Sequence, residues 1–193
     1  MAEKILLHAC CAPCSTVPVP ALTEDGFEVV AFFFNPNVHP HSEFVNRLRS
    51  MQQFVKNREI SGFFYKGYPL ESFLRMQLSQ LESRCEGCYE LRLTAAARKA
   101  KEEGIRVFST TLLVSPYQKH ELIRDLGKSV QKESRIEFLY NDWRPRWHET
   151  RDLARKEDLY LQKYCGCIFS ETERYLEKEG RQHKRGKAAQ ADS

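Results

Sequence analysis

The amino-acid sequence predicts an α/β fold: a single domain with a mostly parallel five-stranded sheet and helices on both of its faces. Five short apolar runs, rich in β-branched and aromatic residues, alternate with segments whose apolar residues recur at helical spacing. This alternation is typical of parallel sheets that are covered by helices. The chain has 193 residues, 41% of them hydrophobic, which suffices for one well-buried domain.

The apolar runs are expected to form strands because turn-forming residues mark their ends. Gly26 precedes the second run, and Asn35-Pro36-Asn37 ends it. The expected strands are residues 4–8, 27–34, 63–65, 105–111 and 136–140.

The segments between these strands have helical patterns. Prolines near the start of the first segment suit a helix N-terminus, and Gly104 stands where a helix cap belongs. The expected helices are residues 16–25, 42–58, 70–81, 89–103 and 120–132, with two more flanking the last cysteine pair. From residue 180 the chain is polar and basic, so we expect a domain over residues 1–179 and a disordered basic tail over 180–193.

Charge and hydropathy indicate which partners and which cellular compartment suit the protein. The net charge of +4 suits a polyanionic partner without requiring one. The first residues lack the long apolar region and the cleavage site of a signal peptide, and the longest apolar stretch, residues 29–34, is too short to span a bilayer. We therefore expect a cytoplasmic protein with no membrane partner.

Seven cysteines are the most informative feature of the composition. They are bunched in three groups, their number is odd, and no export signal is visible, so metal or redox chemistry is favoured over structural disulfides and over unrelated thiols. The groups are Cys10, Cys11 and Cys14; Cys85 and Cys88; and Cys165 and Cys167.

The first group directly follows the first expected strand, and ligands of parallel sheets bind beyond the carboxyl ends of the strands. Thiols at a strand-to-helix turn have lowered pKa values, which favours metal binding and nucleophilic attack. The spacing of Cys85 and Cys88 lets two thiolates bind one metal centre. Iron–sulfur clusters and zinc both take four such ligands, so the spacing leaves the two open, with dithiol redox chemistry as a third reading.

Only one residue separates Cys165 from Cys167. A disulfide across so short a turn is strained and therefore labile, which would suit a redox-active pair. Two further metal ligands, or two unpaired thiols, are equally compatible with this spacing.

Six blocks, in order from residue 4 to residue 175, resemble the cobalamin-independent epoxyqueuosine reductase family. The chain departs from the family pattern at Pro145 and Arg146, where lysine and glycine are expected. The blocks are LLHACCAPCS (6–15), NPNVHP (35–40), CEGCY (85–89), FSTTLLVSPY (108–117), DWR (142–144) and LYLQKYCGCIFS (159–170).

The resemblance implies an oxidoreductase that reduces the epoxide of epoxyqueuosine to queuosine at the wobble position of a tRNA, with release of water. It further implies iron–sulfur chemistry without cobalamin, an electron donor that the sequence does not identify, and a fold like the PP-loop group of nucleotide-binding α-hydrolases (HUP). In that group the loop after the first strand cradles a phosphate. Here cysteines occupy the loop, which argues against ATP hydrolysis.

The ligand assignment follows from this resemblance as a hypothesis. Cys10, Cys11, Cys85 and Cys88 would hold a [4Fe-4S] cluster, because two pairs from two loops close a four-thiolate site. Cys14 would point into the same pocket and could bind an additional iron or contact the substrate oxygen.

Proton delivery to the epoxide oxygen needs an acid. Tyr117 and Asp142 are the candidate donors, although a turn tyrosine and a helix-capping aspartate are equally ordinary readings of these residues. His39 and His120 also lie in or beside the blocks, where a loop histidine with ordinary hydrogen bonds is the commoner reading. Asn35 and Asn37 could shape the pocket or serve as ordinary turn residues. Basic residues could track RNA phosphates or simply form solvated helix faces; they are Arg47, Arg49, Lys56, Arg58, Arg144, Arg146 and Arg151.

Three rival functions stay open. An iron–sulfur tRNA thiolation enzyme related to PP-loop proteins would need ATP. A zinc-stabilised RNA-binding module would use every thiol structurally and would be redox-silent. A thiol–disulfide oxidoreductase rests on Cys165 and Cys167 alone.

Overall fold

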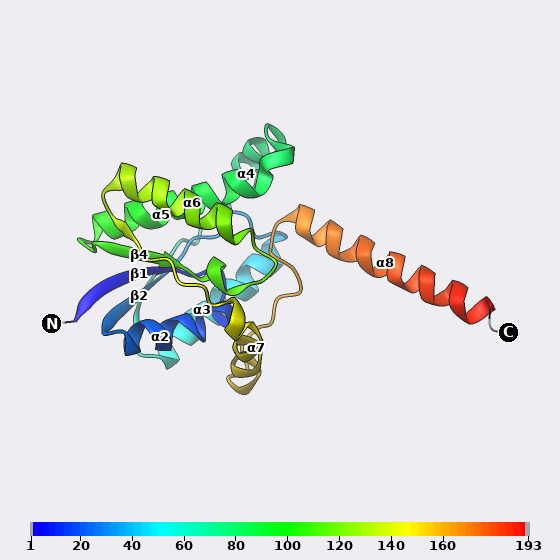
Figure 1. Cartoon of the computed structure of the whole chain (residues 1–193), viewed down its shortest axis with the longest axis horizontal. Coiled ribbons are helices and arrows are strands. Elements are labelled where there is room, and N and C mark those ends of the chain that lie inside the picture. Colours follow the sequence, from blue (N-terminus) through cyan, green and yellow to red (C-terminus); the bar gives the residue numbers. More distant parts are fainter. Residues whose placement is uncertain (1, 192–193) are drawn as a thin grey trace.

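The computed structural model describes residues 2–191, with side chains described through residue 179. Its centre is a five-stranded, entirely parallel sheet with the strand order β3-β2-β1-β4-β5 (Figure 1). The strands are β1 (Glu3–His8), β2 (Phe27–Phe33), β3 (Ser61–Phe64), β4 (Val107–Thr110) and β5 (Glu137–Phe138). The predicted α/β class and all five strands are confirmed.

Strand β1 lies at the middle of the sheet, between β2 and β4. Ile5, Leu6 and Leu7 have no exposed surface, because helices cover both faces of the sheet at this point. This explains why the strand is a continuous apolar run in the sequence rather than an alternating one.

Helices lie on both faces of the sheet. Helices α2 (Pro18–Glu24) and α3 (His41–Asn57) cover one face, and α5 (Arg84–Glu102) and α6 (His120–Ser134) cover the other (Figure 1). The remaining helical segments are α1 (Ala12–Ser15), α4 (Leu70–Leu78), α7 (Trp147–Lys156), α8 (Ile168–Ala191) and the short 3-10 turns η1 (Leu81–Ser83), η2 (Thr111–Val114) and η3 (Arg144–Arg146).

The strand order reverses at β1, whose neighbours are β2 on one side and β4 on the other. A crevice forms at such a switch point, outside the carboxyl ends of the strands. Cys10 lies two residues after the end of β1, and Thr111 directly follows β4, so both lie at the carboxyl edge of the sheet beside this switch point. The topology thus places the first cysteine group where ligands of this fold class bind.

Two element boundaries differ from the prediction. The helix expected over residues 16–25 is found as α2, which covers Pro18–Glu24, and the short helix α1 (Ala12–Ser15) before it was not expected. Residues 82–87 were expected as a loop, but α5 begins at Arg84, so Cys85 and Cys88 lie in its first turns.

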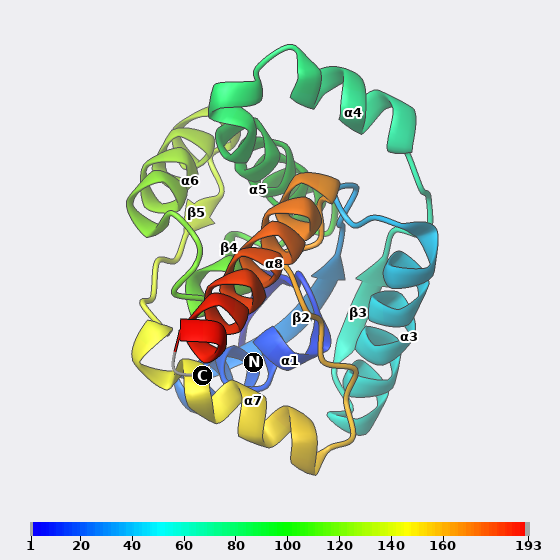
Figure 2. The ribbon, with the colours of Figure 1, turned by 90° about the vertical axis from the view of Figure 1, so that its right-hand side faces the viewer.

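Helix α8 begins directly after Cys167 and projects from the body of the protein (Figures 1 and 2). The expected boundary at residue 180 falls within this helix. The side chains of residues 180–193 lie outside the described part, so the disordered tail stays a prediction. None of the described helices combines the length and the apolar character needed to cross a bilayer.

Candidate metal centre

Three thiols of the first cysteine group lie side by side at the carboxyl end of β1. The Cys11 side chain caps the N-terminus of α1 by accepting a hydrogen bond from the backbone N–H of Cys14 at 3.4 Å, and Pro13 pre-sets the first turn of that helix. The Sγ atoms of Cys10 and Cys11 are 3.7 Å apart. Within the described residues, Cys10, Cys11 and Cys14 form the one metal-ligand group of three or more whose ligand atoms all lie within 4.8 Å of one another.

Two distant segments donate hydrogen bonds to these sulfur atoms. The Thr111 hydroxyl donates to Cys10 Sγ at 3.2 Å and accepts from the Cys10 backbone N–H at 2.9 Å. Gln162 Nε2 donates to Cys11 Sγ at 2.8 Å. Sequence reasoning gave neither residue a role, although both lie inside blocks that carry the family resemblance.

The three thiols of this group differ in their pKa values. Hydrogen bonds from Cys11, Cys14 and Thr111 hold the pKa of Cys10 well below its usual range. Burial raises the pKa of Cys11, and the hydrogen bond to Cys10 raises that of Cys14. Without metal, Cys10 is therefore the thiol of the group that loses its proton most readily.

The second cysteine group lies on α5. Cys88 is buried, which raises the pKa of its thiol to about 12. Its charge interacts with those of Cys85, Cys165 and Cys167, so the second and third groups share one neighbourhood. These four cysteines are not part of the close three-thiol group, and the division of ligands between Cys14 and the Cys85–Cys88 pair stays a prediction.

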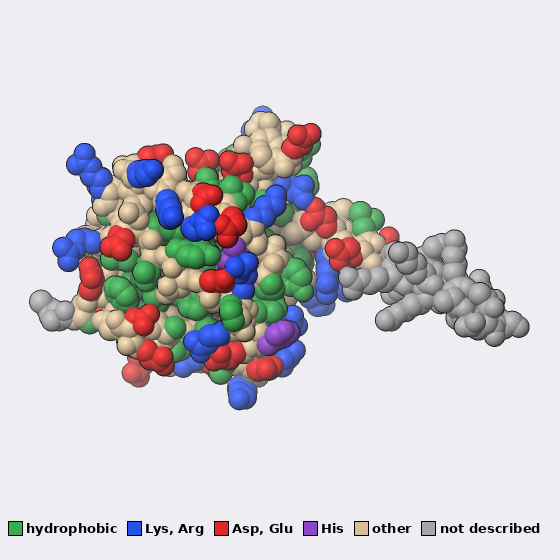
Figure 3. All heavy atoms as spheres, viewed as in Figure 1, with side chains coloured by type: hydrophobic (Ala, Val, Ile, Leu, Met, Phe, Trp, Pro, Cys, Tyr) green, Lys and Arg blue, Asp and Glu red, His purple; other side chains and the backbone are tan. Residues whose placement is uncertain are grey.

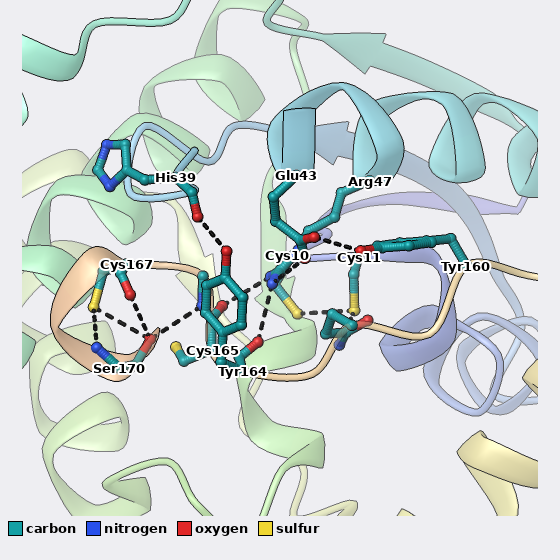
Figure 4. Close-up of polar contacts among 12 residues, drawn as sticks. Cys10, Cys11, His39, Glu43, Arg47, Tyr160, Tyr164, Cys165, Cys167 and Ser170 are labelled. Atoms are coloured by element: carbon teal, nitrogen blue, oxygen red, sulfur yellow. Dashed lines mark hydrogen bonds and ion pairs between the residues drawn. The ribbon is translucent and has the colours of Figure 1, made fainter. Parts of the chain in front are cut away.

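The third cysteine group, Cys165 and Cys167, lies in a tight turn that is hydrogen-bonded to the loop after β2 (Figure 4). The backbone N–H of His39 donates to Gly166 O at 2.8 Å, and the Tyr164 hydroxyl donates to His39 O. Gly166 has φ +133°, and a Cβ at this residue would lie 3.0 Å from Arg47 Nη1. Only glycine therefore fits the turn. Cys165 and Cys167 are both free thiols, so a redox-active disulfide between them stays a prediction.

Arg47 stabilises this turn through hydrogen bonds. Its two Nη atoms donate to the carbonyls of Cys165 and Tyr164 at 2.8 and 2.9 Å, and it forms a buried ion pair with Glu43 at 2.7 Å (Figure 4). The Tyr160 hydroxyl donates to the same carboxylate. The suggestion that Arg47 tracks RNA phosphates is therefore wrong, because the guanidinium is buried and its donors are used.

The two candidate proton donors sit in different surroundings. Tyr117 is 82% exposed and packs edge-on against Trp147. Asp142 accepts hydrogen bonds from the Arg144 side chain and backbone, which lower its pKa to about 2. That pairing keeps Asp142 ionised and disfavours it as an acid, whereas the Tyr117 hydroxyl is free to meet a substrate. Both catalytic roles stay predictions.

Several buried polar side chains near the site have nitrogen or oxygen atoms with no hydrogen-bond partner among the described residues. They include both ring nitrogens of His39 and of His120, and both amide atoms of Asn37. His120 Nδ1 lies 3.8 Å from Asp142 Oδ1. Burial lowers the pKa of His39 to about 4, so this ring is neutral at physiological pH. Unused polar atoms of this kind are what a ligand or ordered water would satisfy.

Comparison with solved structures supports the fold. The U34-tRNA thiolase NcsA from Methanococcus maripaludis, solved with its [4Fe-4S] cluster, superposes with a TM-score of 0.61 at 15% sequence identity, over 88% of this chain and 61% of that one. A predicted subunit of a tRNA methyltransferase from Methanocaldococcus jannaschii superposes with a TM-score of 0.52. At this level of identity, the likeness concerns the fold alone.

Comparison of sequences is more specific. The profile of the family described as epoxyqueuosine reductase QueH matches residues 5–173. The epoxyqueuosine reductase QueH of Dehalococcoides mccartyi is 34% identical over 175 residues, covering 91% of this chain and 96% of that protein. The enzyme of the same name from Acinetobacter baylyi is 34% identical over 190 residues, covering 93% and 87%. The chain therefore belongs to the epoxyqueuosine reductase QueH family of oxidoreductases.

Proposed function

We propose that this protein reduces the epoxide of epoxyqueuosine at the wobble position of a tRNA to the alkene of queuosine. The observation that carries the proposal is the three-thiol group at the switch point of the sheet, in a chain that belongs to this reductase family. The reaction consumes two electrons and two protons, breaks both C–O bonds of the epoxide, and releases its oxygen as water. The electrons come from an external donor.

The donor set fits an iron–sulfur cluster, because thiolates are the ligands that such clusters take. Cys10, Cys11, Cys85 and Cys88 would hold a [4Fe-4S] cluster, with Cys14 beside it and free to bind an additional iron or the substrate oxygen. When bound, the cluster supplies electrons and Lewis acidity at the epoxide oxygen, and no cobalamin is required. The clustering of Cys14 with Cys10 and Cys11 makes Cys14 the alternative ligand in this assignment.

The protein's own residues would then orient the ligands and deliver protons. Thr111 and Gln162 fix the positions of the Cys10 and Cys11 sulfurs through direct hydrogen bonds. Tyr117, the exposed tyrosine of the loop after η2, is the donor that a substrate could reach, and Asp142 is the second candidate.

The tRNA would approach the carboxyl edge of the sheet, where all three cysteine groups meet. Arg144 and Arg146 lie near this edge, but each is paired with an acidic neighbour, Asp142 and Glu149 respectively. An RNA phosphate would therefore have to compete with a carboxylate for each of these arginines. The exposed ring of Tyr117 offers a surface on which an unpaired base could stack.

The first test is anaerobic purification followed by iron, sulfide and zinc analysis, with absorption spectra before and after dithionite. We expect roughly four or more irons per chain, matching sulfide, and bleaching of the thiolate-to-iron absorption on reduction. The loaded protein should then convert epoxyqueuosine in tRNA to queuosine when given an electron donor. Loaded protein that leaves the epoxide intact under these conditions would contradict the proposed reaction.

A second candidate function is a zinc-stabilised RNA-binding module. The 3.7 Å between the Sγ atoms of Cys10 and Cys11 favours it, because two thiolates on one tetrahedral zinc ion lie about 3.8 Å apart. Stoichiometric zinc without sulfide, after iron-replete anaerobic expression, would move this candidate to first place.

A further inference from the structure

Arg92 is a buried cation beside the second cysteine group. It lies on α5, one helical turn after Cys88, and only 1% of its surface is exposed. Its Nε atom donates to the Cys88 carbonyl at 3.2 Å, and its guanidinium lies over the Tyr89 ring, 5.8 Å from the centroid. These contacts fix the side chain in one orientation.

The guanidinium is not fully satisfied by the chain. Its Nη2 atom is buried and has no hydrogen-bond partner among the described residues. A buried charge with an unused donor is unfavourable, so buried guanidinium groups in native proteins are paired with an anion. The open donor therefore points to an anionic partner.

The surroundings identify the chemistry of that partner. The groups whose charges act most strongly on Arg92 are Cys88, Cys165, Cys10 and Tyr89, and no carboxylate is among them. The three cysteines come from all three cysteine groups. Arg92 thus lies near segments that supply thiols, and the negative charge that it would meet there is that of cysteine sulfurs once they bind a metal.

We propose that Arg92 is a positioning residue that donates an N–H···S hydrogen bond from Nη2 to a sulfur of the bound cluster and supplies positive charge beside it. The inference rests on the proposed function, since it requires a cluster at this site. Hydrogen bonds to sulfur and nearby charge set the reduction potential of such clusters. Reduction adds negative charge, so Arg92 favours the reduced state and raises the potential.

The test compares reconstituted wild-type protein with Arg92→Gln and Arg92→Lys by redox titration monitored by electron paramagnetic resonance. For Arg92→Gln we expect unchanged iron and sulfide content but a lower potential. At a fixed potential near the midpoint, the ratio of reduced to oxidised cluster should fall about tenfold, equivalent to about 59 mV for a one-electron couple. Arg92→Lys keeps the charge, so its potential should lie between the other two.

Arg98→Gln is the matched control, because this arginine is on the same helix with a largely exposed side chain paired to Glu102. Its cluster should titrate like that of the wild type. An unchanged potential in Arg92→Gln, or a raised KM for the RNA with no change in potential, would overturn the role of Arg92. Failure of the wild-type protein to assemble any cluster would instead contradict the proposed function itself.

A second measurement needs no variant and covers the case in which Arg92→Gln does not fold. Reduced wild-type holoenzyme carrying 15N-labelled arginine should show a 15N coupling to the cluster by pulsed electron paramagnetic resonance, and protein with 15N-labelled lysine should not. Absence of the arginine coupling would exclude the hydrogen bond.

Discussion

Thr111 and Gln162 place hydrogen-bond donors against the sulfurs of Cys10 and Cys11 from segments that are distant in the sequence. Such donors stabilise a thiolate more than a thiol and so lower its pKa. At the scale of single residues, the site is therefore tuned by side chains that are not themselves metal ligands. Their pairing with particular thiols was not visible in the sequence, because nothing in a linear pattern says which side chains meet across 100 or more residues.

Replacing Thr111 by valine should slow the reaction of Cys10 with iodoacetamide in metal-free protein at pH 7. The variant loses the hydroxyl that donates to Cys10 Sγ, so the pKa of Cys10 rises and less thiolate is present. Time-resolved mass spectrometry of the Cys10 peptide measures the rate. Thr94→Val, at an exposed position of α5, is the control and should react like the wild type.

His8 should make the protein less stable below pH 6.5. Burial, reinforced by the nearby Arg92 charge, lowers its pKa from 6.5 to about 4. Between these values the unfolded chain binds a proton that the folded chain does not, so stability falls as the pH drops through this window. From pH 7 to pH 5 this group alone removes about 2 kcal/mol from the free energy of unfolding.

Urea unfolding of wild-type protein and His8→Gln at both pH values checks this expectation. The variant should lose about 2 kcal/mol less than the wild type between pH 7 and pH 5. His148→Gln, at an exposed position, should show the wild-type pH dependence. Equal pH dependence in wild type and His8→Gln would show that His8 is already protonated or solvated in the folded protein.

At the scale of elements, Arg47 ties helix α3 to the turn that carries Cys165 and Cys167. Replacing Arg47 by methionine would leave Glu43 buried without its partner and free the two carbonyls of the turn. We expect a loss of about 3–5 kcal/mol in the free energy of unfolding, measured with urea. The reactivity of Cys165 should also change, because its backbone is no longer held.

Arg75→Met is the matched control for Arg47→Met. Arg75 and Glu71 form the same four-residue spacing of arginine and glutamate on helix α4, but both side chains are largely exposed. An exposed pair of this kind contributes at most about 0.5 kcal/mol. If both variants lose equally little stability, the Arg47 network does not hold the turn.

Helix α5 shows why one element boundary was mispredicted. From the sequence, the helix that carries the second cysteine group was expected to begin only at residue 89. In the structure Gly87 is inside the helix, and a Cβ at this position would lie 2.1 Å from Gln80 Nε2. The helix continues through this glycine while α5 packs against α4 and η1, a tertiary contribution that local propensity does not report.

At the scale of the whole molecule, the cysteine groups meet only once the sheet and its crossovers have formed. The ligand hypothesis predicts that Cys85→Ser loses most of the iron and the charge-transfer absorption, whereas Cys14→Ser keeps both. Iron analysis and absorption spectra after identical anaerobic reconstitution compare the two variants. The reverse result would make Cys14 the ligand, as its position beside Cys10 and Cys11 allows.

The molecular surface bears on RNA binding at the same scale. On the face shown in Figure 3, Lys and Arg side chains are interspersed with Asp and Glu rather than gathered into one basic patch. Many basic side chains form ion pairs with acidic ones, as Arg146 does with Glu149 and Arg124 with Glu121. Broad electrostatic attraction alone would give weak binding, so recognition of a tRNA would depend on contacts at the site.

The sequence by itself determined the α/β class, the five strands and the position of the first cysteine group. These depend on local patterns, namely apolar runs, helical spacing and turn residues, which a chain shows without folding. The tertiary structure alone decided that Thr111 and Gln162 donate to the Cys10 and Cys11 sulfurs, and that Arg47 is buried against the turn of Cys165. These facts depend on contacts between residues far apart in the chain, and only the assembled sheet with its packed helices brings those residues together.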